Sequence, residues 1–329
     1  MPKQEGNDAL MEELLGDDVL PSDVDYAKLK KFYDPDQPRD PAGTETGGRW
    51  TSGGGGTWAA SGTAGPGSPL PPHGTGRDFE VIPGARHGRA HPDEIKAVQE
   101  RVLDPGTAED REYALIWDLD DNQVHGVYQG QATAVELTDE QMEEVANGGG
   151  TYAFHHNHPG DGTLSIPDIV STYSAPGIKE VWAHGDRGSV YQVMKINGYG
   201  PAEVIEAGHA ADNAVINTLK DDFRNFVASI DPTSLSDRHA AVAKQNVLSR
   251  MHQHAVLSAM SKAGVFEYNY KLSDKWARDY KSEENRALFN RAVDNAVMAI
   301  ATSGISPKFV WHPEEVTVTH SAPWMVHNG

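Results

Sequence analysis

The amino-acid sequence predicts an α/β (α+β) protein, in which a mixed sheet is flanked by helices and followed by a helical domain. Three observations predict this class. Short strand-like apolar runs alternate with helical patterns between residues 84 and 200. After residue 200 helical periodicity prevails. From residue 36 to residue 83 the chain is rich in Gly and Pro and lacks the apolar side chains that a core requires, so we expect a disordered N-terminal arm ahead of the sheet.

The charge and the residue composition indicate which partners and which metal ligands this chain can have. The chain has 329 residues, a formal net charge of -20 and no cysteine. Because such a charge repels phosphate backbones, nucleic acid is not an expected partner. Any metal ion must be held by His, Asp or Glu. The N-terminus lacks the apolar core of a signal peptide, and no apolar run is long enough to cross a membrane, so we expect a soluble, intracellular protein without membrane partners.

Two segments precede the predicted sheet. Residues 1–35 are acidic and carry short amphipathic helical patterns, and residues 36–83 form a Gly/Pro-rich flexible linker. The linker contains Arg-Asp-Pro (39–41) and Gly-Gly-Arg-Trp-Thr-Ser (47–52). These strings resemble linkers of tailed-phage structural proteins. The resemblance implies a phage-encoded chain, present in the host cytoplasm or in the virion, that contacts viral assembly partners through its N-terminal arm and C-terminal helices.

Within residues 84–200 the local patterns predict two hairpins and several helices. One hairpin joins strands 112–119 and 123–128 through an Asp-Asp-Asn turn, and the other joins strands 179–184 and 189–195. Helices are expected after Pro92, from Thr138 to about Ala146, and from Ser165 to about Tyr173. A short strand is expected over residues 151–155.

Residues 201–329 predict a helical domain, or a helical layer on the first domain. Three long helical patterns lie near residues 209–228, 236–263 and 282–302. Ser236 and Ser282 are the expected N-caps of the second and third helices. Two short strands are expected near the end of the chain, at residues 309–311 and 316–318.

Possible metal ligands are concentrated between residues 154 and 168. His156 and His158 lie two positions apart, and both can reach one cation if the preceding strand has ended. Ser165 as an N-cap places Asp168 at the third helical position, where the helix dipole favours an ionised carboxylate. Imidazole nitrogen and carboxylate oxygen suit zinc. The sequence therefore predicts a Zn²⁺ site made of His156, His158 and Asp168.

The segments His156-Asn157-His158-Pro159 and Ser165-Ile166-Pro167-Asp168 together resemble the motif of the JAMM/MPN (JAB-type) zinc metallopeptidases. Six residues separate His158 from Ser165, one fewer than usual in the family, as in its phage and bacterial branches. The resemblance covers about residues 80–200. It implies a zinc-dependent metalloprotease or isopeptidase that hydrolyses a peptide or isopeptide bond, with virion proteins or ubiquitin-like conjugates as substrates.

The resemblance also implies a catalytic glutamate on an early strand, which accepts a proton from a metal-activated water and passes it to the leaving amine. Glu112 opens the first predicted strand and is the favoured candidate, while Glu109 and Glu136 are its rivals. The family pattern gives Ser165 the role of hydrogen-bonding the developing oxyanion.

Other histidines are set aside. His155 neighbours His156 in the expected strand and should face the opposite side. His252 and His254 lie mid-helix, where residues two apart point away from each other. Three rival functions remain: a non-catalytic phage structural or interaction protein on an MPN-like scaffold, a RadC-like protein associated with nucleic acid, and a toxin or effector domain.

Overall fold

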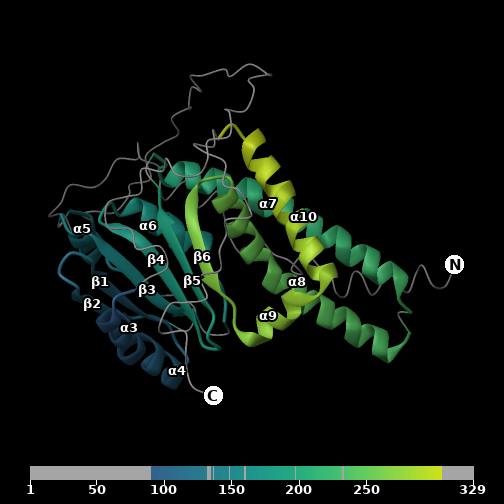
Figure 1. The fold of residues 1–329 in the computed structure, drawn as a ribbon, viewed down its shortest axis with the longest axis horizontal. Helices are drawn as coiled ribbons and strands as arrows, with labels where there is room; N and C mark the ends of the chain where they lie inside the picture. The colour runs from purple at the N-terminus through teal and green to yellow at the C-terminus, as the bar shows by residue number, and fades with distance from the viewer. Residues whose placement is uncertain are drawn as a thin grey trace.

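A computed structural model describes residues 90–131, 135, 137–147, 149–158, 161–196, 198–231 and 233–305. The predicted N-terminal segment, the linker, Glu136 and the two short terminal strands lie outside the described residues. Within them the chain forms a six-stranded mixed sheet flanked by helices, which confirms the predicted fold class (Figure 1). None of the helices described is long and apolar enough to cross a membrane.

The sheet has the strand order β2-β1-β3-β4-β5-β6. Its strands are β1 (Tyr113–Asp118), β2 (Gln123–Gln129), β3 (Tyr152–His158), β4 (Ile178–Gly185), β5 (Val190–Lys195) and β6 (Phe266–Lys271). Neighbours pair antiparallel except for β3 and β4, which are parallel. A parallel pair needs a crossover connection, and α6 (Ile166–Ser174) provides it. Both predicted hairpins, β1–β2 and β4–β5, are confirmed.

One face of the sheet is covered by α3 (Pro92–Val98) and the π-helical segment η1 (Gln99–Leu103), which continue into α4 (Asp104–Glu109) (Figure 1). Val98 and Val102 pack there with side chains from the strands, among them Leu115, Trp117 and Trp182. Alternation along β1 sends Ile116 to the other face, where it packs with Val145 of α5 (Asp139–Asn147).

The other face carries α6 and the three long helices that the sequence predicted, which are α7 (Pro201–Ser229), α8 (Leu235–Lys262) and α10 (Glu283–Thr302) (Figure 1). Their apolar stripes share one hydrophobic core with β4 and β5. The residue that caps α8 is Ser234 and not Ser236 as predicted, because Ser234 accepts the Asp237 N–H while Ser236 already lies inside the helix. Ser282 caps α10 as predicted.

Two elements within residues 201–305 were not predicted, β6 and the helix α9 (Asp274–Lys281). β6 lies next to β5 and extends the sheet, so the helical region supplies a strand as well as a covering layer. Phe266 and Tyr268 alternate with less buried residues, which is a strand pattern. The local sequence of so short a strand does not predict its pairing partner, because that partner depends on how the long helices around it pack.

His252 and His254 point apart on α8, as predicted. His252 Nε2 lies 2.6 Å from Asp212 Oδ1 of α7. His254 is buried among aromatic rings, with Nδ1 2.9 Å from the hydroxyl of Tyr268. Burial lowers the pKa of His254 to about 3, because the apolar surroundings disfavour the charged ring.

Acid is expected to destabilise the fold through His254. The unfolded chain binds the proton near pH 6.5 and the folded chain only near pH 3, so the free energy of unfolding falls as the pH drops between these values. For this residue alone the loss from about pH 7.5 to about pH 5.5 is about 1 kcal/mol. Urea unfolding of the wild type and His254→Gln at both pH values measures it. Equal pH dependence in the two proteins would contradict the prediction.

Candidate metal centre

The strand β3 places both histidines of the predicted motif. It runs through His158 and not only to His155 as predicted, because it pairs with β1 as far as His156 and with β4 as far as His158. The expectation that the strand ends before the histidines is therefore wrong. Since alternate residues of a strand share a face, His156 and His158 project on the same side through the pleat of β3 rather than through a loop.

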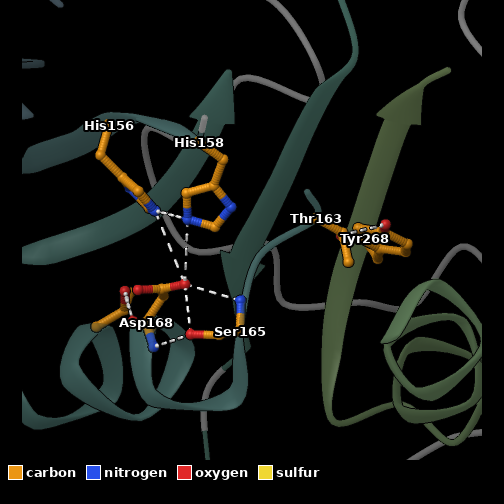
Figure 2. A network of polar contacts seen from close by, with 7 residues as sticks. His156, His158, Thr163, Ser165, Asp168 and Tyr268 are labelled. Carbon is orange, nitrogen blue, oxygen red and sulfur yellow. Dashed lines mark hydrogen bonds and ion pairs between the residues drawn. The ribbon is translucent and has the colours of Figure 1, made fainter. Parts of the chain in front are cut away.

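The N-terminus of α6 brings the third group to this face. Ser165 has extended backbone angles and caps the helix, as predicted, with Asp168 at the third helical position. Asp168 Oδ2 accepts hydrogen bonds from the Ser165 N–H at 2.7 Å and from the Ser165 hydroxyl at 2.6 Å. In return the Asp168 N–H donates to Ser165 Oγ at 3.3 Å. This reciprocal cap orients the carboxylate toward the histidines (Figure 2).

His156, His158 and Asp168 converge at a single point. The two Nε2 atoms lie 2.9 Å apart, and Asp168 Oδ2 lies 3.7 Å from that of His156 and 3.8 Å from that of His158. Tetrahedral bonds of about 2.0–2.2 Å to imidazole and carboxylate hold ligand atoms roughly 3.3–3.5 Å apart. In the part of the chain that the structure describes, this is the one cluster of three such ligand atoms within 4.8 Å of one another. The group can therefore hold a metal ion.

The charges of the three groups also suit a cation. Burial opposes ionisation of Asp168, but His156, His158 and the hydrogen bonds from Ser165 outweigh it and hold the pKa well below its usual range. Burial and the neighbouring His156 lower the pKa of His158 to about 4, so this ring is neutral. For His156 the attraction of Asp168 and Glu112 outweighs burial and raises the pKa. A cation bound at this point would take the place of the proton that His156 otherwise attracts.

The ring nitrogens have distinct surroundings. His156 Nδ1 is buried and has no hydrogen-bond partner among the described residues, whereas Nε2 faces His158 and Asp168. The Nδ1 of His158 lies beside Gly162, whereas its Nε2 faces His156 and Asp168. Both histidines therefore direct Nε2 to the common point, as a shared metal ion requires.

Of the three candidate glutamates, Glu112 lies on the face of the sheet that carries this group, near enough for the charges of His156 and Asp168 to act on it. It precedes β1 by one residue and lies two positions before Ala114, which pairs with His156, so the pleat directs it to the histidine face. Glu112 is buried, and this burial, together with the charge of Asp168, raises its pKa to about 7 against the opposing effect of His156. Glu109 is exposed and accepts a hydrogen bond from Gln129. Glu136 lies outside the described residues.

In this structure Ser165 hydrogen-bonds the carboxylate of Asp168. Both of its donors, the backbone N–H and the hydroxyl, are directed at Asp168 Oδ2. The oxyanion role implied by the family resemblance stays a prediction. A hydroxyl in this position can give that hydrogen bond only by turning away from the carboxylate.

His155 lies on the opposite face of the sheet, as predicted. Its Nε2 is 2.8 Å from Glu94 Oε1, and its Nδ1 is 3.1 Å from His184 Nε2. All three side chains are buried. The sequence did not indicate this network, because Glu94 lies 61 positions before His155 and its local pattern indicates only the N-cap of α3.

The sequence also did not indicate how the loop between the histidines and α6 is held. Asp161 is buried and hydrogen-bonded by Ser189 and Ser273. The Thr163 hydroxyl lies 3.2 Å from that of Tyr268 in β6 (Figure 2). A Pro/Gly-rich loop predicts a sharp turn, but its distant partners follow from the tertiary structure.

The wild-type protein is expected to bind about one equivalent of Zn²⁺ or Co²⁺, and His156→Ala to lose at least about 100-fold in affinity because it removes one of three protein ligands. Exposed His239 of α8 offers a matched control, since His239→Ala removes an imidazole far from the cluster in sequence. Titration calorimetry after dialysis against a chelator measures both. Equal binding by the wild type and His156→Ala would show that the ion binds elsewhere.

Comparison with known proteins adds no relative to this description. No family model matches the chain, no curated protein matches it, and no solved structure matches it. The function is therefore argued from the metal group and from the residues around it.

Proposed function

We propose that this protein is a JAMM-type zinc metallopeptidase that hydrolyses a peptide or isopeptide bond. One observation carries the proposal. A group of two imidazoles and one carboxylate, suited to a metal ion, shares a face of the sheet with the buried side chain of Glu112. A structural metal site needs ligands alone, whereas an adjacent buried carboxylate is what proton transfer during hydrolysis requires.

The donor set favours zinc. Two imidazole nitrogens and one carboxylate oxygen suit this ion, and three protein ligands leave a fourth position for water or substrate, as in catalytic zinc sites. A zinc ion bound there supplies Lewis acidity, which acidifies water and polarises a carbonyl. The side chain of His156 is 1% exposed, while those of His158 and Asp168 are 14% and 24% exposed. Substrate would therefore approach from the side of His158 and Asp168.

The side chains of the protein would divide the remaining work. Glu112 would take a proton at its carboxylate and return it to the leaving amine. Ser165 would keep Asp168 oriented as a ligand through its N–H, and its hydroxyl would turn to the oxyanion. Burial of Glu112 and His156 would keep bulk water away from the proton path.

The substrate class follows from the resemblance of the linker and the motif to phage and bacterial proteins. We infer a phage-encoded enzyme whose substrate is a viral structural precursor or a ubiquitin-like conjugate. In this proposal the N-terminal arm and the C-terminal helices bring the active site to an assembly partner.

Glu112→Gln is expected to lower hydrolysis by about 100-fold or more while zinc stays bound, because the amide keeps the shape and cannot accept the proton. Glu109→Gln is the matched control, since Glu109 lies nearby in the chain but is exposed. The assay incubates zinc-loaded protein with a proteome-derived peptide library and with lysine-linked ubiquitin conjugates, and mass spectrometry identifies new termini and released ε-amines.

The outcomes separate the candidate functions. Cleavage abolished in Glu112→Gln and retained in Glu109→Gln supports the proposed roles. Cleavage retained in Glu112→Gln would rule out Glu112 as the base. Stoichiometric zinc without cleavage of either substrate class would favour the non-catalytic scaffold, and absence of bound zinc would remove the basis of the enzyme proposal.

A further inference from the structure

We propose that Asp161 is a positioning residue for the metal centre, and that through it β5 and the C-terminal region hold the ring of His158 in place. This inference rests on the proposed metal site. It concerns residues 161–165, here named the metal loop, which lead from the end of β3 to the cap of α6.

The carboxylate of Asp161 joins three separate parts of the chain. Its Oδ1 accepts the backbone N–H of Ser189 at 3.1 Å, and its Oδ2 accepts the hydroxyls of Ser189 at 2.8 Å and Ser273 at 2.7 Å. Ser189 precedes β5, and Ser273 caps α9 in the C-terminal region. The Ser273 N–H also donates to Ser189 Oγ at 2.9 Å, which closes the network. All three side chains are buried, so these contacts do not compete with bulk water.

The backbone conformation at Asp161 and the glycine at position 185 allow the Asp161 carboxylate to reach Ser189 and Ser273. Asp161 has a φ of 69°, a left-handed conformation that Asp and Asn adopt more readily than most residues. Its carboxylate lies directly over Gly185, the residue of β4 that pairs with His158. A Cβ atom at position 185 would overlap the Asp161 side chain. The glycine thus allows the loop to turn back immediately beside the second histidine.

Asp161 lies next to the groups that orient His158. The Asp161 N–H donates to the His158 carbonyl at 3.3 Å. The ring of His158 lies against the residue that follows Asp161, since its Nδ1 lies beside Gly162. In metal sites a polar group beside the second nitrogen of a histidine ligand helps to select the tautomer and the ring angle that present Nε2 to the metal.

A second link holds the other end of the metal loop. The Thr163 hydroxyl lies 3.2 Å from the hydroxyl of Tyr268 (Figure 2). The same Tyr268 hydroxyl lies 2.9 Å from His254 Nδ1. Tyr268 belongs to β6 and His254 to α8. The metal loop is thus fixed on both sides of Gly162 by residues from beyond position 188, and the C-terminal region becomes part of the support of the metal centre.

The test measures metal affinity apart from hydrolysis. Asp161→Asn keeps the size of the side chain but replaces one carboxylate oxygen with an amide N–H₂. This group donates and cannot accept, so at least one hydrogen bond that Ser189 or Ser273 donates to the carboxylate is lost. We expect it to weaken Zn²⁺ binding by about 10- to 100-fold in competition with a chromophoric chelator. We also expect an altered absorption spectrum of bound Co²⁺, which reports ligand geometry. Thr163→Val is expected to shift both in the same direction by a smaller amount.

Asp212→Asn is the matched control. Asp212 is also a buried carboxylate with a close partner, His252, but it lies between α7 and α8. Its substitution is expected to lower the free energy of unfolding in urea while the Zn²⁺ affinity stays within about two-fold, because separate sites act independently. Circular dichroism of each metal-free variant shows whether it is folded.

Three results would overturn the positioning role. Asp161→Asn could bind Zn²⁺ as tightly as the wild type with the same Co²⁺ spectrum, it could weaken binding only as much as Asp212→Asn does, or it could be unfolded without metal, which would make Asp161 a residue of the fold. Metal binding by the wild type without hydrolysis would refute only the proposed enzyme. A wild type that binds no metal would refute both proposals.

Discussion

The pleat of β3 between its two neighbours is the constraint on which the site depends. β3 pairs with β1 on one side and with β4 on the other, so its direction and register are set along the whole histidine segment. A shift of one residue would send each side chain to the other face. His156 and His158 would then face α3 and η1, away from Asp168. The metal group is thus a consequence of strand register rather than of a flexible histidine loop.

On each face of β3 a carboxylate lies close to the histidine side chains that the strand projects there. A buried imidazole is unfavourable unless it is hydrogen-bonded. On the face covered by α3, Glu94 lies against His155, which in turn contacts His184. On the other face Asp168 lies against His156 and His158, with Glu112 nearby. In the first network His155 contacts Glu94 and His184 through different ring nitrogens, whereas in the second the Nε2 and Oδ2 atoms converge at one point.

The region from α7 to α10 both covers the sheet and contacts the loop behind His158. Its long helices bury the apolar face of the sheet and share one core with it, while β6 and the start of α9 send Tyr268 and Ser273 to the loop behind His158. Removing the helical region would therefore expose apolar surface and also release the metal loop. Two of the residues that hold this loop, Tyr268 and Ser273, lie more than 100 positions beyond the histidines.

Local patterns were enough to predict the two hairpins, the three long helices, the Ser165 cap with Asp168 at its third helical position, and the separation of His155 from His156. These depend on side-chain periodicity and on hydrogen bonds within a few residues. Four features became apparent only in the folded chain: β3 continues to His158, β6 joins the sheet, buried Glu112 rather than exposed Glu109 faces the histidine group, and Asp161 contacts Ser189 and Ser273. Each of these depends on a strand neighbour or a hydrogen-bond partner distant in the chain, and local patterns do not encode such pairings.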